Sequence, residues 1–205
     1  MQSIGIFGGT FDPPHVGHLI LAAEAQAQFS LNRLLWVLTL DPPHKQGRSI
    51  TPIHHRLAMV KLALADAPEF ELSTVDIDRP GPHFAVDTVR IIAAQNPGAK
   101  LVYLMGGDSL RDLPTWHDPA GFVSACHSIG VLRRPGDAID LPGLEKNLPG
   151  LTARVRFMEA PLLDIAAHDI RERVAAGRPF RYYLPARVYE YISELGLYSS
   201  NFRDR

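Results

Sequence analysis

The sequence predicts an α/β fold, namely a Rossmann-like parallel sheet with helices on both faces and a small helical part towards the C-terminus. Short apolar runs closed by turn residues alternate along the chain with helical stretches. The apolar runs lack the polar alternation of half-exposed strands, which indicates strands buried on both faces of a parallel sheet. The length of 205 residues fits a single domain over residues 1–205, with the C-terminal helical part at about 165–198.

Six apolar runs are expected to form the strands. Four of them are strong candidates, because each is closed by residues that turn the chain. These four span residues 3–7, 34–38, 101–105 and 128–132. Two weaker runs, at residues 70–73 and 155–157, complete the expected sheet.

Five helices are expected between these strands, because apolar residues recur about one helical turn apart. They span residues 16–29, 53–65, 85–94, 169–176 and 184–195. The fourth ends at Gly177 and Pro179, while the last has Pro185 at its start and Gly196 just after its end. The stretch 134–149 is rich in Pro, Gly and Asp, so we expect a surface excursion with a helical piece there.

The amino-acid composition excludes several classes of protein. Hydrophobic residues make up 46% of the chain and charged residues 21%, which excludes a disordered chain. A net charge of −1 lacks the basic excess of a nucleic-acid binder, so no nucleic-acid partner is expected. The single cysteine, Cys126, excludes an internal disulfide and disfavours a structural zinc site. Without a secretory signal or a membrane-spanning apolar run, we expect a cytoplasmic protein with no membrane partner.

The segment GGTFDPPHVGH at residues 8–18 is the most informative, because it follows the first strand and opens the first helix. Ligands of open α/β sheets bind at the carboxyl ends of the strands. Gly8 and Gly9 let a ligand approach the backbone closely, and a helix N-terminus favours phosphate. His15 and His18 are three residues apart, so we expect both rings on one side of the first turn. Gly17 between them is expected to leave room for a bulky group.

Plainer interpretations of the two histidines stay open. A histidine at a helix start is often only a cap or a surface residue. A His-x-x-His pair can also bind a metal ion, but no obvious third ligand lies nearby in the sequence, so no metal-ligating residue is expected. The segment contains neither a P-loop nor a dinucleotide-binding glycine motif.

The whole string resembles the Thr/His-x-Gly-His signature of the nucleotidylyltransferases. The chain is similar to the bacterial nicotinate-nucleotide adenylyltransferases from residue 4 to about residue 198. Further landmarks follow in that family's order: PPHK at 42–45, HRLAM at 55–59, GDSL at 107–110, LPTW at 113–116, RRPG at 133–136, IR at 170–171 and GLY at 196–198. Two segments depart from the family's pattern, because HFA at 83–85 replaces Ser-Tyr-Thr and AAH at 166–168 replaces Ser-Ser/Ala-Thr.

The resemblance implies adenylyl transfer from ATP to nicotinic acid mononucleotide, which gives deamido-NAD and pyrophosphate in NAD biosynthesis. It also implies Mg²⁺ as the cofactor, bound through the ATP phosphates with mostly water ligands. The implied catalytic residues are His15, His18 and Arg171. The implied ATP-binding residues are Gly8, Gly9, Thr10, Phe11, Gly107, Asp108, Arg134 and Ile170. The implied residues for the nicotinate nucleotide are Lys45, Ala85, Trp116 and His117.

Several of these residues have a plainer alternative. Trp116 either stacks on the pyridine ring or packs in the core, and Asp108 either accepts from a ribose hydroxyl or caps the following helix. Lys45 either binds the mononucleotide phosphate or is a solvated loop lysine, and Arg56 is either functional or a helix-surface charge. His168 is a candidate replacement for the missing hydroxyl donor.

Substrate choice leaves further alternatives. The resemblance places the backbone N–H groups of Ala85 and His117 at the substrate carboxylate. Two N–H donors satisfy a carboxylate, whereas the NH₂ group of an amide would face one of them. The runner-up is an adenylyltransferase for nicotinamide mononucleotide or phosphopantetheine. From another class, a nucleotide-binding sensor without turnover is left open by the altered segment 166–168. The sequence does not decide between a monomer and a homo-oligomer.

Overall fold

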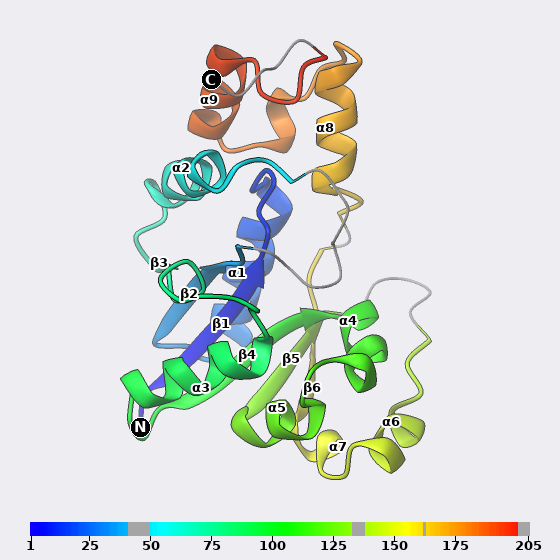
Figure 1. Cartoon of the computed structure of the whole chain (residues 1–205). Helices are drawn as coiled ribbons and strands as arrows, with labels where there is room; N and C mark the ends of the chain where they lie inside the picture. Colours follow the sequence, from blue (N-terminus) through cyan, green and yellow to red (C-terminus); the bar gives the residue numbers. More distant parts are fainter. Residues whose placement is uncertain (41–49, 133–137, 162, 201–205) are drawn as a thin grey trace.

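The computed structural model describes residues 1–40, 50–132, 138–161 and 163–200. Within them, one six-stranded sheet has the order β3-β2-β1-β4-β5-β6, and every neighbouring pair is parallel. The strands are β1 (Ser3–Gly9), β2 (Arg33–Leu38), β3 (Phe70–Ser73), β4 (Lys100–Gly106), β5 (Ser128–Leu132) and β6 (Val155–Met158). All six predicted runs therefore form strands, and the sheet is parallel as expected (Figure 1).

Strand β1 lies inside the sheet and determines where a ligand can bind. Its residue Ile6 pairs with Leu35 of β2 on one side and with Tyr103 of β4 on the other. The chain adds β2 and β3 on the first side and then crosses over to add β4, β5 and β6 on the second. Because the strand order reverses between β1 and β4, a ligand-binding crevice is expected at their carboxyl ends.

Helices cover both faces of this sheet. The longer ones are α1 (Val16–Gln28), α2 (Ile53–Leu64), α3 (Ala85–Gln95), α8 (Ala167–Ala175) and α9 (Ala186–Leu195). The shorter ones are α4 (Gly107–Asp112), α5 (Pro119–Ala125), α6 (Leu141–Asn147) and α7 (Leu151–Arg154), with 3₁₀ turns η2 (Leu113–Thr115) and η3 (Arg181–Tyr183). One buried cluster joins the sheet to α3 and α5, and a second joins it to α1 and α2. Burial on both faces explains why the strand sequences lack polar alternation.

The C-terminal helices have a core of their own against α2. Met59 and Ala63 of α2 pack in one cluster with Ile170 of α8 and with Val188 and Ile192 of α9. Figure 1 shows α2, α8 and α9 gathered at one end of the molecule. This packing fixes α8 beyond the sheet, where its first turns can reach the loop that follows β1.

Some details differ from the sequence prediction. Pro185 is the N-cap residue of α9 rather than its first helical residue, and α8 begins at Ala167 rather than at Asp169. The short helices α4, α5 and α7 were not predicted, because so few residues do not display a helical period. The helical piece expected within 134–149 is α6, while residues 133–137 lie outside the described part. In the described residues, no helix has the length and apolar character needed to cross a membrane.

Candidate active site

The last two residues of β1, Gly8 and Gly9, make room for aromatic side chains. A Cβ atom on Gly8 would lie 3.1 Å from the hydroxyl oxygen of Tyr103, and one on Gly9 would lie 2.9 Å from the ring of Phe11. Phe11 has a φ angle of 46° and stacks on Trp36, with 4.8 Å between the ring centroids. Phe11 as a whole is 2% exposed. A nucleotide could therefore meet only the main chain of Phe11, whose ring anchors the loop in the core.

His15 and His18 lie together at the start of α1, as the sequence predicts. Their rings are stacked, with 3.6 Å between the centroids and 24° between the planes. The main-chain N–H of His15 donates to Nδ1 of His18 over 3.1 Å, so the neutral ring of His18 carries its proton on Nε2. Burial lowers the pKa of His15 to about 4, so this ring is neutral near pH 7.

Gly17 has a different role from the one expected. A Cβ atom at this position would lie 3.0 Å from Nδ1 of His15. The space beside Gly17 is therefore occupied by the ring of His15 and is not left open for a bulky group.

Asp12 connects this loop to the C-terminal part of the chain. Its carboxylate is buried and accepts from the hydroxyl of Tyr198 over 2.8 Å and from the main-chain N–H of Thr51 over 3.2 Å. Its main-chain oxygen accepts from Nη1 of Arg171 over 2.7 Å. Arg171 is thus brought to the loop that carries the histidines. Tyr198 was not predicted as a contact, because 186 positions separate it from Asp12.

Arg56 holds the same loop through hydrogen bonds to main-chain oxygens. The residue is 2% exposed, so the interpretation as a helix-surface charge is wrong. Its guanidinium donates to four main-chain oxygens at 2.8–3.1 Å: those of Thr10, Thr39, Leu40 and Thr51. Arg56 therefore holds the end of β1, the end of β2 and the start of α2 together. One of its acceptors, the carbonyl of Thr10, belongs to a residue predicted to bind ATP.

The end of β4 lies beside the end of β1, at the edge of the sheet where a ligand is expected to bind. Gly106 is the N-cap residue of α4, and Gly107 and Asp108 form the first turn of that helix. The Asp108 side chain is exposed, and its Oδ1 accepts from the main-chain N–H of Ser109 over 2.9 Å. Gly106 leaves room for this carboxylate, because a Cβ atom there would collide with Oδ1. The side chain thus bonds its own helix while remaining accessible for the predicted ribose contact.

The residues expected to bind the nicotinate ring lie near one another and near β4. Trp116 directly follows η2, and its half-buried ring packs edge-on against Phe122 with 5.3 Å between the centroids. His117 stacks on Phe84 at 4.0 Å between centroids and 19° between planes. Ala85 is the first residue of α3, where a main-chain N–H has no acceptor within its own helix. The stack of His117 on Phe84 brings the start of α3 next to the segment after η2.

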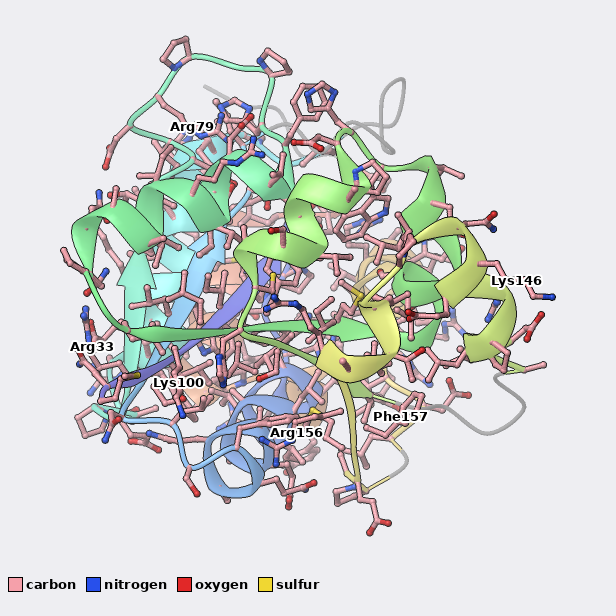
Figure 2. The ribbon with its side chains drawn as sticks, turned by 90° about the horizontal axis from the view of Figure 1, so that it is seen from below. Arg33, Arg79, Lys100, Lys146, Arg156 and Phe157 are labelled. Carbon is pink, nitrogen blue, oxygen red and sulfur yellow. The ribbon has the colours of Figure 1, made fainter. Side chains whose placement is uncertain are left out.

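A buried polar network that the sequence analysis did not predict supports the start of α3. The carboxylate of Asp76 is buried and accepts from the hydroxyl of Thr88 over 2.7 Å and from Nη2 of Arg79 over 3.1 Å. Arg79 also donates to the main-chain oxygens of Pro82 and Phe84 over 3.0 and 3.4 Å. Figure 2 shows Arg79 at the loop beside α3. The network fixes the backbone that leads into Ala85.

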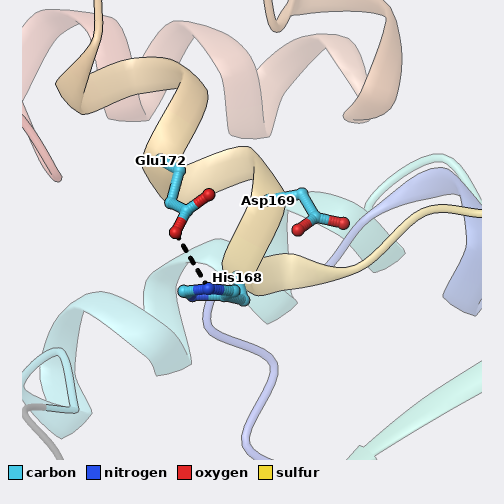
Figure 3. A group of neighbouring side chains, drawn as sticks. All are labelled: His168, Asp169 and Glu172. Atoms are coloured by element: carbon cyan, nitrogen blue, oxygen red, sulfur yellow. Dashed lines mark ion pairs between the residues drawn. The ribbon is translucent and has the colours of Figure 1, made fainter.

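The remaining predicted residues fall into two groups. Lys45 and Arg134 lie outside the described residues. Ile170 is fully buried in the core of the C-terminal helices, so only its main chain could meet ATP. His168 is exposed, and its Nε2 lies 3.0 Å from Oε1 of Glu172 (Figure 3). Its ring therefore pairs along α8 in this structure, and no contact supports its proposed replacement of a hydroxyl donor.

The sheet order and the paired histidines at the carboxyl end of β1 define a Rossmann-like α/β protein with a candidate nucleotide site at that edge of the sheet. A family model described as cytidylyltransferase-like matches residues 6–173. A relative from Thermomicrobium roseum, named a probable nicotinate-nucleotide adenylyltransferase, is 49% identical over 97% of this chain and 92% of its own. Another of the same name, from Roseiflexus sp., is 45% identical over 95% and 97%. The chain belongs to the nicotinate-nucleotide adenylyltransferase family within the cytidylyltransferase-like proteins.

A solved structure has the same fold. The Plasmodium falciparum nicotinic acid mononucleotide adenylyltransferase complexed with NaAD superposes with a TM-score of 0.80. The alignment covers 97% of this chain and 98% of that chain at 18% identity. At this identity the likeness confirms the Rossmann-like fold, including the C-terminal helices.

Proposed function

We propose that this chain transfers the adenylyl group of ATP to the phosphate of nicotinic acid mononucleotide, giving deamido-NAD and pyrophosphate in NAD biosynthesis. One observation carries the proposal most directly. The stacked His15 and His18 open α1 at the carboxyl end of β1, and Arg171 is hydrogen-bonded to the same loop. The names of the relatives, which align over nearly the whole chain, support the same reaction.

The reaction needs charge stabilisation more than acid–base chemistry. An oxygen of the acceptor phosphate forms a bond to the α-phosphorus of ATP, and the bond from that phosphorus to the bridging oxygen of pyrophosphate breaks. Pyrophosphate leaves with the electron pair. Because the nucleophile is already an anion, catalysis requires the two substrates to be positioned and their negative charge to be stabilised.

The described residues fit these tasks. His18 carries its ring proton on Nε2, which suits donation to a phosphate oxygen of ATP. Arg171 contributes a positive charge near the same loop, and the N-terminus of α1 favours negative charge through its dipole. ATP is expected to enter as its Mg²⁺ complex, in which the ion is held by phosphate oxygens and water.

The acceptor is proposed to lie on the other side of the crevice. The pyridine ring would stack on the accessible part of Trp116, and its carboxylate would accept from the main-chain N–H groups of Ala85 and His117. Two N–H donors satisfy a carboxylate, whereas the NH₂ group of an amide would face one of them. This arrangement favours the acid over nicotinamide mononucleotide.

Pyrophosphate release with ATP and a panel of acceptors tests the proposal. The panel contains nicotinic acid mononucleotide, nicotinamide mononucleotide and phosphopantetheine. We expect release that depends on nicotinic acid mononucleotide and yields deamido-NAD. Release with only one of the other acceptors would assign the chain to the runner-up activity, while ATP binding without release from any acceptor would indicate a sensor.

The compartment in which the reaction takes place is inferred from the composition. We expect the reaction to take place in the cytoplasm, which the one buried cysteine, Cys126, and the ordinary composition support.

A further inference from the structure

Tyr103 occupies a position that the proposed chemistry has not used. It lies on β4, where it pairs with Ile6 of β1 and with Ile129 of β5. Its ring packs edge-on against Trp116, with 6.3 Å between the centroids and 76° between the planes. Its hydroxyl points towards β1, because a Cβ atom on Gly8 would lie 3.1 Å from that oxygen. The side chain therefore extends from the proposed nicotinate platform to the start of the loop that carries the histidines.

The hydroxyl of Tyr103 makes no hydrogen bond to any described residue. The residue as a whole is only partly buried. Burial is the main cause that raises the pKa of this phenol well above its ordinary value. The group is therefore a protonated donor near pH 7. A donor of this kind, partly withdrawn from water, favours an acceptor oxygen supplied by a ligand.

The order of the groups in a mononucleotide suggests which oxygen this is. Its ribose lies between the pyridine ring and the phosphate. The ring is assigned to Trp116, and the phosphate must reach the α-phosphorus of ATP, whose phosphates are assigned to the loop with His15 and His18. We infer that the hydroxyl of Tyr103 donates a hydrogen bond to the ribose of the acceptor nucleotide. The inference rests on the proposed function, and it makes Tyr103 a binding residue for the acceptor and not for ATP.

The test removes the hydroxyl with Tyr103→Phe, which keeps the ring and its packing on Trp116. The expected result is an increase of about fivefold to twentyfold in the KM for nicotinic acid mononucleotide, as for loss of one partly buried hydrogen bond. The KM for ATP should stay within about twofold, as for loss of no hydrogen bond. Tyr182→Phe is the matched control, because Tyr182 is 88% exposed and lies in η3, outside the proposed site.

Acceptor analogues separate a direct contact from a structural effect. Wild-type and Tyr103→Phe enzymes are compared on nicotinic acid mononucleotide and on its 2′-deoxy and 3′-deoxy analogues. If the contact is direct, one deoxy analogue lowers kcat/KM for the wild type but has little further effect on the variant. A general disturbance of the site would instead give independent losses from the variant and from both analogues.

Several outcomes overturn the inference without touching the proposed function. These are independent losses with both analogues, a KM for the acceptor unchanged in Tyr103→Phe, or an increase in the KM for ATP alone. Failure of the wild type to use nicotinic acid mononucleotide would instead refute the proposed function itself, and with it this inference.

Discussion

The hydrogen bond between Tyr198 and Asp12 gives a test of how the catalytic loop is held. The Tyr198 hydroxyl donates over 2.8 Å to a carboxylate that belongs to a residue 5% exposed. Burial and the adjacent Asp12 raise the pKa of this phenol well above its ordinary value, so it stays protonated and able to donate near pH 7. Tyr198→Phe removes the hydroxyl, and the carboxylate keeps the main-chain N–H of Thr51 as a donor.

The expected cost follows from the burial of this carboxylate. A hydrogen bond to a charged group contributes about 1.5–3 kcal/mol to stability. For a chain of 205 residues this corresponds to a fall in Tm of roughly 3–12 °C. Turnover should also decrease, because Asp12 holds Arg171 and lies in the loop that leads into His15. Thermal unfolding and steady-state kinetics on the same preparation measure both effects.

The matched control is Tyr182→Phe, which removes a hydroxyl from an 88% exposed side chain. This variant should keep the wild-type Tm and turnover. If Tyr198→Phe behaves like the control in both measurements, then the link to Asp12 holds neither the fold nor the loop.

The other predictions concern the residues around this loop. His18→Ala should lower kcat about 10²–10³-fold, as for loss of one transition-state donor. The control is His127→Ala at an exposed position, which should leave kcat unchanged. Near-normal turnover in a folded His18→Ala protein would contradict the role assigned to His18. Arg171→Ala should raise the KM for ATP about tenfold or more, as for loss of a hydrogen bond to a charged group. The control is Arg187→Ala on the exposed face of α9, which should leave this KM unchanged. Unchanged ATP kinetics in Arg171→Ala would place Arg171 away from the phosphates. The lowered pKa of His15 means that the unfolded chain binds a proton more readily, so stability should fall as the pH decreases from about 6.5 to about 4. This loss of stability amounts to at most about 3 kcal/mol. It should be smaller in His15→Gln, and urea unfolding of both proteins across that pH range measures the difference. Equal pH profiles of stability for the two proteins would refute the prediction.

The strands and the longer helices could be predicted because each depends on a local pattern. A buried parallel strand is a continuous apolar run, and a helix shows apolar residues one turn apart. The predicted boundaries of β3 and β5 agree with the structure. Helices α4 and α5 escaped prediction because six or seven residues give little periodicity, so their existence depends on packing against the sheet.

The candidate site was predictable only in part. The pairing of His15 with His18 follows from their spacing, and local spacing is enough to place both on one turn. Arg56 was left undecided, because its acceptors at Thr10 and Thr39 lie 46 and 17 positions away and depend on the sheet order. Phe11 was assigned to ATP from the motif alone. Its burial against Trp36 depends on pairing between β1 and β2 that the motif does not reveal.

The tautomer of His18 and the neutral state of His15 also required the structure. The tautomer of His18 depends on the hydrogen bond from the main chain of His15, and the neutral state of His15 depends on its burial. The spacing of the residues in the sequence predicts neither. The hydrogen bonds from Arg79 and Thr88 to Asp76 could not be predicted either. They stabilise the fold because the carboxylate of Asp76 is buried, and that burial is visible only in the structure.

The most direct test of the central claim compares two acceptors side by side on one preparation of the wild-type enzyme. Pyrophosphate release with ATP gives kcat/KM for nicotinic acid mononucleotide and for nicotinamide mononucleotide. We predict that the acid is preferred by at least about 10²-fold, because two main-chain donors at Ala85 and His117 match a carboxylate and not an amide. Equal efficiencies, or no release with the acid, would contradict the account.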